Sequence, residues 1–167
     1  MEGIVNKVAE SGLITINLED FLPKEECVMF DLRQFLFMDL ILKEKDFRQG
    51  LKEFPWQDFE NKYVTVFCSA DAIIPLWAYM LSAVYLQPVA KEVFYGTIES
   101  MKEKILFKEI ENISPEKFSE KRIVIKGCGD TSIPAAAYLA ITKKLMPFVK
   151  SLMYGEPCST VPVYKKK

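Results

Sequence analysis

The sequence predicts an α/β protein of three layers, in which helices cover both faces of a mostly parallel sheet. Residues 42–97 align without a gap on residues 101–156, with 15 identical pairs among 56. Within each copy, short β-branched segments alternate with longer helical ones, which is typical of a parallel sheet. A length of 167 residues fits one domain. We therefore expect residues 1–167 to form a single domain built from two duplicated β-α-β units with an N-terminal β extension.

The two copies contain the same succession of elements. An amphipathic helix comes first, at about 44–53 or 100–112, and a short linker follows it. β-branched residues then predict a strand, a helix begins near a proline and ends near another, and a second strand ends at a glycine. The predicted strands are 63–67 and 92–95 in the first copy, and 122–126 and 151–154 in the second.

The order of these strands follows from how two linked β-α-β units usually associate. Such units commonly form one doubly wound sheet, with the first strands of both halves adjacent. The expected order is therefore 92–96, 63–68, 122–127, 151–155. Two N-terminal segments, 13–18 and 27–30, also have strand character, but the sequence does not place them in this order.

Composition excludes several classes of function. The 22 basic and 23 acidic residues leave no basic surplus for nucleic acid. Residues 72–90 are uncharged and nearly long enough to span a membrane, but their counterpart contains Lys143 and Lys144, so we expect a buried helix and no membrane partner. Without a secretory signal the expected location is the cytoplasm. The chain has no histidine, which excludes Ser-His-Asp and Cys-His mechanisms within one chain.

The predicted topology brings three cysteines and two aspartates to one rim of the sheet. Cys68 and Asp71 follow strand 63–67, Cys128 and Asp130 follow strand 122–126, and Cys158 follows the last strand. Ligands bind beyond the carboxyl ends of strands in such sheets. Thiolates suit zinc and iron–sulfur clusters, so one hypothesis is a metal or iron–sulfur site with Cys68, Cys128 and Cys158 as ligands. The sequence contains no Cys-x-x-Cys pair, and buried structural thiols are the alternative.

A second hypothesis is a small-molecule or anion-binding protein, or an enzyme, that uses the turn Gly127–Ser132. Its two glycines allow close approach of a ligand to the backbone, and first-turn amides of a helix attract anions. A capped strand-to-helix turn without a ligand is the alternative. The candidate ligand-binding residues of this rim are Asp71, Gly127, Gly129, Asp130, Thr131 and Ser132.

A third hypothesis is a protein that acts by binding other proteins, as a homo-oligomer or as an assembly partner. The extended tail at 159–164 is either packed on its own domain or bound to a second subunit. Tyr95 and Tyr154, which precede glycines at the two strand ends, either line the rim or close the core.

Several strings resemble an uncharacterised bacterial family of unknown function that is common in Bacteroidetes. The resemblance covers nearly the whole chain and is carried by Lys126-Gly127-Cys128-Gly129-Asp130 and by the C-terminal string from Met153 to Tyr164, MYGEPCSTVPVY. Other matching strings are 4–13, 42–48 and 68–73. The family implies no established activity. Its association with iron–sulfur assembly genes implies an iron–sulfur assembly partner and favours the metal hypothesis.

Overall fold

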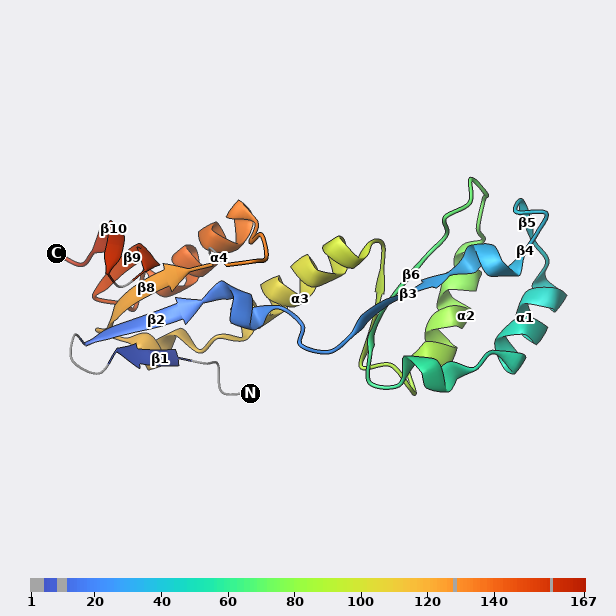
Figure 1. The fold of residues 1–167 in the computed structure, drawn as a ribbon, viewed down its shortest axis with the longest axis horizontal. Helices are drawn as coiled ribbons and strands as arrows, with labels where there is room; N and C mark the ends of the chain where they lie inside the picture. Colours follow the sequence, from blue (N-terminus) through green and yellow to red (C-terminus); the bar gives the residue numbers. More distant parts are fainter. Residues whose placement is uncertain (1–4, 9–11, 128, 157) are drawn as a thin grey trace. The chain divides into compact units, whose positions relative to one another are not determined.

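The computed structural model describes residues 5–8, 12–127, 129–156 and 158–167 (Figure 1). The described residues form four α-helices and a set of mostly parallel strands, which confirms the predicted α/β class. The chain divides into two compact units: unit 1 comprises Met1–Leu22 with Glu103–Lys167, and unit 2 comprises Pro23–Lys102. The single domain, the three layers and the duplication stay predictions.

Unit 1 contains a five-stranded sheet in the order β1-β2-β8-β9-β10. Its three inner strands run parallel, and the outermost strand on each side is antiparallel to its neighbour. The strands are β1 (Val5–Val8), β2 (Leu13–Asn17), β8 (Arg122–Lys126), β9 (Ser151–Glu156) and β10 (Ser159–Lys165).

Unit 2 contains a three-stranded parallel sheet in the order β3-β6-β7. Its strands are β3 (Cys27–Asp31), β6 (Tyr63–Phe67) and β7 (Glu92–Tyr95). A separate pair of two-residue strands, β4 (Leu36–Phe37) and β5 (Ile41–Leu42), runs antiparallel.

The helices have bounds close to those that the sequence predicts. The α-helices are α1 (Glu44–Glu53), α2 (Leu76–Leu86), α3 (Ile98–Asn112) and α4 (Ala135–Leu145). Short 3-10 helices follow strands or precede them: η1 (Leu18–Phe21), η2 (Leu32–Phe35), η3 (Trp56–Phe59) and η4 (Pro115–Phe118).

Many features of the two units recur at a spacing of 59 residues. The bounds of η3, β6 and α2 become those of η4, β8 and α4 when 59 is added. Asn61 and Glu120 both have positive φ, at 58° and 57°, and their amides donate to the carbonyls of Val89 and Phe148. Fully buried side chains also correspond, as in Phe47/Leu106, Val64/Ile123, Ala78/Ala137 and Leu86/Leu145.

A second correspondence links the N-terminal strands, at a spacing of 14 residues. Each strand leads into a 3-10 helix whose preceding side chain caps it: Asn17 accepts from the Glu19 amide, and Asp31 from the Arg33 amide. The next residue, Leu18 or Leu32, is fully buried. Each half therefore contains the same N-terminal feature, a strand followed by a capped 3-10 helix, which we call its strand-and-turn unit. The sequence alone did not reveal it.

These N-terminal strands explain an error in the predicted strand order. The expected neighbours 92–96/63–68 and 122–127/151–155 are confirmed, but β6 and β8 do not pair. β2 pairs with β8 and β3 pairs with β6 instead, so an N-terminal strand occupies the edge at which the two halves were expected to meet. The two halves accordingly have separate sheets.

Each sheet has its own core, but one helix is less buried than expected. Leu106, Ile123 and Ile141 belong to the core cluster of unit 1, and Phe30, Phe47 and Val64 to that of unit 2. Within the apolar segment 72–90, α2 buries Ala78, Ser82 and Leu86 but exposes its opposite face. The expected buried helix is therefore buried on one face only. In the described residues, no helix has the length and apolar character needed to cross a membrane.

The C-terminal tail packs on its own unit. It forms β10 antiparallel to β9, with a register shift between Pro162 and Tyr164. Gly155 precedes the turn at φ 114°, and a Cβ at this position would lie 2.6 Å from the Ser159 carbonyl oxygen. Only glycine allows this return of the chain without strain.

We predict that Leu18→Ala and Leu32→Ala each lower the free energy of unfolding by about 2–5 kcal/mol, because each truncation leaves a cavity in a core. Urea unfolding followed by circular dichroism measures the change. Leu40→Ala, at an exposed position of unit 2, is the control and should change stability by less than about 0.5 kcal/mol. Equal, small effects for all three variants would contradict the proposed role of the strand-and-turn units.

Candidate functional site

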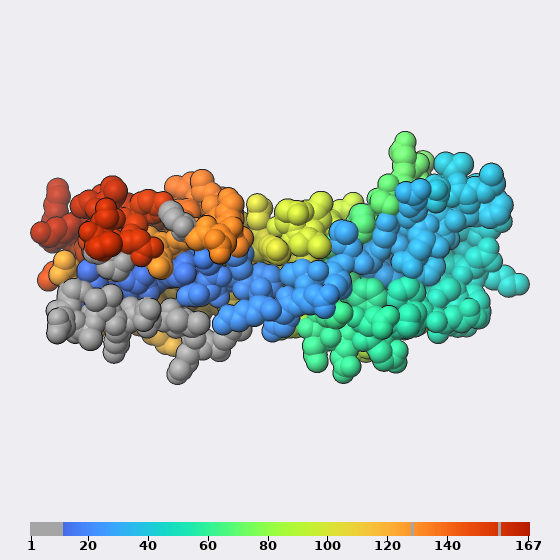
Figure 2. All heavy atoms as spheres, in the orientation of Figure 1, coloured from blue at the N-terminus to red at the C-terminus, as the bar shows by residue number. Residues whose placement is uncertain are grey.

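The rim that was expected to collect cysteines and aspartates is not formed as predicted. It required β6 and β8 to be neighbours, and they belong to different sheets. Cys68 and Asp71 lie in the loop after β6, in unit 2. Cys68 is half-buried and its thiol points to the Ala70 carbonyl at 3.7 Å, whereas Asp71 is exposed. Figure 2 shows this loop, in green, projecting from the surface.

The other predicted residues lie in unit 1. Gly127, Gly129, Asp130, Thr131 and Ser132 form the loop between β8 and α4, and the last three are exposed. Cys158 is exposed at the turn between β9 and β10. Cys128 lies outside the described residues.

The described residues give no support for a metal centre. None of them form a group of three or more His, Cys, Asp or Glu side chains that could hold a metal ion. The predicted set of Cys68, Cys128 and Cys158 includes a residue outside the described part of the chain. A site made of all three thiols therefore stays a prediction.

The glycine turn after β8 receives a carboxylate from the chain itself. Glu19, in the first turn of η1, lies so close to Gly129 that a Cβ on this glycine would collide with both carboxylate oxygens. The Thr131 amide donates to Glu19 Oε1 at 3.4 Å. An external anion at this turn would have to displace Glu19, since two negative groups in one place repel each other.

The matching loop of unit 2 is held in a related way. The Ser69 amide and hydroxyl donate to Asp31 at 3.0 and 2.5 Å, and Asp31 also accepts from the Arg33 amide. Burial alone raises the pKa of the Asp31 carboxyl, but these hydrogen bonds outweigh it, so the pKa lies below its ordinary value. In both halves, an acidic side chain from the strand-and-turn unit therefore contacts the loop that follows the neighbouring strand of the same sheet.

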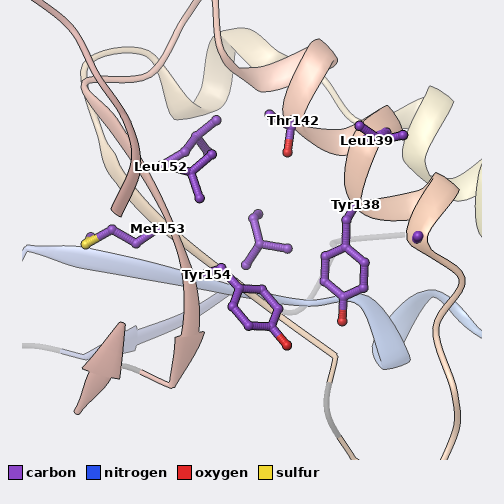
Figure 3. A pocket seen from close by; sticks show the side chains of 9 residues that line it. Tyr138, Leu139, Thr142, Leu152, Met153 and Tyr154 are labelled. Carbon is purple, nitrogen blue, oxygen red and sulfur yellow. The ribbon is translucent and has the colours of Figure 1, made fainter. Parts of the chain in front are cut away.

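An apolar cavity of about 400 Å³ lies in unit 1, between α4 and the strands beside it. Ligand pockets commonly have volumes of about 300–1,000 Å³. Figure 3 shows Tyr138, Leu139 and Thr142 on the helix side and Leu152 and Tyr154 on the strand side. The described residues that line it are Ile125, Ala135, Tyr138, Leu139, Thr142, Leu152, Met153, Tyr154 and Val163. None of these residues is charged.

Two tyrosines stand at one side of the cavity. The rings of Tyr138 and Tyr154 meet nearly edge to face, with centroids 5.7 Å apart and planes at 70°. The Tyr138 hydroxyl lies against Gly127, where an added Cβ would be 2.5 Å from it. Gly127 is therefore needed because Tyr138 lies too close to its backbone for a larger residue. This contact joins the predicted turn Gly127–Ser132 to the cavity.

Unit 2 has the same tyrosine pair in a different setting. Tyr79 and Tyr95 are equivalent to Tyr138 and Tyr154, and their centroids are 5.5 Å apart. In the described residues, however, β7 has only β6 as a strand neighbour, so this unit lacks a counterpart of β10. Because Val163 of β10 lines the cavity of unit 1, that strand supplies a wall which unit 2 lacks.

The sequence singled out only part of this site. Tyr154, which the sequence predicts to line the rim or close the core, does line the cavity, and Val163 belongs to the predicted extended tail. Nothing in the sequence indicates Leu139 or Thr142. One signal could have pointed to the site, because Tyr79/Tyr138 and Tyr95/Tyr154 are both identical between the copies. Val163 carries no such signal because it lies beyond the repeat.

We predict that Asp31→Asn destabilises unit 2 more at neutral pH than at low pH. The folded-state pKa of Asp31 is lowered, so its contribution is present above the unfolded-state pKa of about 3.9 and is lost as the pH falls through the folded-state value. Urea unfolding of the natural protein and of Asp31→Asn, from neutral pH to below the unfolded-state pKa, measures the difference in their free energies of unfolding. A stability difference that is constant with pH would contradict the role of the Asp31 charge.

Comparison with known proteins assigns the chain to a family. The model of a family described as a protein of unknown function, DUF2480, matches residues 2–166. No curated protein and no solved structure matches the chain. Because the family model covers nearly the whole sequence, this chain belongs to the DUF2480 family.

Proposed function

We propose that unit 1 binds a small, uncharged and mainly apolar molecule in the cavity between α4 and the strands β8, β9 and β10. The observation that carries this proposal is the cavity itself, whose volume of about 400 Å³ and apolar lining fit such a ligand. It also reaches Ile125 and Tyr154, near the carboxyl ends of β8 and β9, and α/β proteins commonly bind ligands at this edge of a sheet.

The lining defines the chemistry of the ligand. The aliphatic groups of Leu139, Leu152 and Val163 offer dispersion contacts and exclude water. Among the lining side chains, only Tyr138, Thr142 and Tyr154 carry a hydroxyl, and the others are apolar. A charged ligand would lose its hydration without gaining a counter-charge from these residues, so a neutral and mainly apolar ligand is favoured.

We predict that Ala135→Leu weakens binding of small neutral probes about tenfold or more, because the larger side chain fills part of the cavity. Unit 2 has Leu76 at the equivalent position, so the fold accepts leucine there. Methyl NMR titration with indole, phenol and 1-hexanol measures affinity and location together. The shifts should concentrate on Ile125, Leu139 and Leu152.

The matched control for this experiment is Ala136→Leu, which adds the same side chain one residue further along α4, at an exposed position that does not line the cavity. It should bind the probes like the natural protein. Probe binding that is equal in all three proteins, or shifts that appear only outside the cavity, would refute the proposal.

A metal or iron–sulfur role, alone or with an assembly partner, is the second candidate that the sequence suggests. Its support is the chemistry of the thiols of Cys68, Cys128 and Cys158, which suit zinc and iron–sulfur clusters. The described geometry does not add to it. We place it after apolar binding for this reason.

The metal hypothesis makes a direct prediction. Protein purified without oxygen should contain zinc or iron in near-stoichiometric amount, and Cys128→Ser should lose it, because removal of one thiolate opens the coordination shell. Elemental analysis of both proteins measures this. Cys27→Ser, which changes a thiol outside the predicted set, should keep the metal. Metal-free protein that is folded and takes up neither ion would reject the hypothesis.

A further inference from the structure

The helix α2 of unit 2 exposes a stripe of large apolar side chains. Ile73, Leu76, Met80 and Val84 have 94%, 80%, 71% and 65% of their surface exposed. Their spacings of three and four residues place those within α2 on one helix face, with Ile73 just before its start. Large exposed apolar stripes on a helix commonly mark a contact surface.

The fold does not require this stripe, because the equivalent helix of unit 1 lacks it. The positions equivalent to Ile73, Leu76, Met80 and Val84 are Ser132, Ala135, Leu139 and Lys143. Both helices bury equivalent residues on their inner faces, as Ala78 and Ala137 show. Two helices in the same structural position therefore differ mainly on their outer faces, so the apolar stripe of α2 needs a reason other than folding.

We propose that this stripe is the interface of a homodimer, in which α2 packs antiparallel against α2 of a second copy about a two-fold axis near Met80. In such an interface each position faces one fixed position of the other copy. Leu76 lies four residues before Met80 and Val84 four residues after it, so each would meet the other across the axis. The inference involves unit 2 only and does not depend on the proposed ligand cavity.

The absence of charge favours a second copy as the occupant. Residues 72–90 contain no Asp, Glu, Lys or Arg, so two identical faces meet without like-charge repulsion. A partner with a charged surface would find no counter-charge on this stripe. An apolar face is complementary to itself, which is what a two-fold interface needs.

The area of the stripe is also close to what a dimer requires. Each large aliphatic side chain buries on the order of 100 Å², so the four residues supply about 400 Å² per copy. A standard interface buries about 800 Å² per partner, of which about 450–520 Å² is apolar. The stripe therefore supplies most of the apolar share.

The first test is the oligomeric state of the full chain. Sedimentation equilibrium of the natural protein should give twice the chain mass of 19.2 kDa. Val84→Lys should raise the dimer dissociation constant at least about tenfold, because it buries an unpaired charge against Leu76 of the other copy. Lysine is accepted on this fold at the equivalent position, Lys143. A natural protein that is monomeric at high micromolar concentration would overturn the proposal.

The matched control is Val161→Lys, which makes the same change at a position of similar exposure, 60%, in β10 of unit 1. It should leave the dimer intact. A dimer that survives Val84→Lys, or one that both variants disrupt equally, would show that the stripe is not the interface. Binding of monomeric natural protein to phosphatidylcholine vesicles would assign the stripe to a lipid surface and would also overturn the proposal.

A second variant tests the antiparallel arrangement. Met80→Cys should form a disulfide-linked dimer on mild oxidation, because the two Met80 positions lie beside the axis and a disulfide needs Cα atoms within about 7 Å. Val161→Cys and the natural protein, with its own thiols, are the controls. A dimer that Met80→Cys does not cross-link more than these controls would refute the proposed axis.

Discussion

The constraint on which the structure depends is the parallel pairing of an N-terminal strand with the first strand of each β-α-β segment. β2 pairs with β8 over five residues, and β3 pairs with β6 over five residues. Without β3, the sheet of unit 2 would keep only β6 and β7, and without β2, the sheet of unit 1 would lose one of its three inner strands. The same strands also lead into the 3-10 turns that bury Leu18 and Leu32 and bring Glu19 and Asp31 to the loops beyond the next strands.

This constraint gives the two halves the same framework, but their surfaces differ. Unit 1 extends its sheet with β10, and Val163 of this strand closes one side of an apolar cavity. Unit 2 has no described counterpart of β10, and α2 instead exposes Leu76 and Met80. Both Ala78 and Ala137 are fully buried and identical, since packing leaves little room there, whereas outer positions are free to take on separate roles.

Local structure was more predictable from the sequence than the association of its elements. The strands at 63–67 and 122–126 and the helices after Pro75 and Pro134 have strong local signals, and they form as expected. Strand order depends on non-local pairing, and the segments at 13–18 and 27–30 contain no local sign of their partners. The predicted rim was wrong for the same reason, because it assumed that β6 and β8 are neighbours. The cavity was missed because its walls come from three strands and a helix, and none of its residues forms a motif.

The most direct test of this account is the strand pairing itself, measured in solution by NMR of the full chain. Parallel pairing of β2 with β8 and of β3 with β6 predicts cross-strand contacts between residues 14–16 and 123–125, and between residues 28–30 and 64–66. Cross-strand contacts between Val64 and Ile123, in place of these, would show that β6 and β8 are neighbours after all and would contradict the two-sheet arrangement.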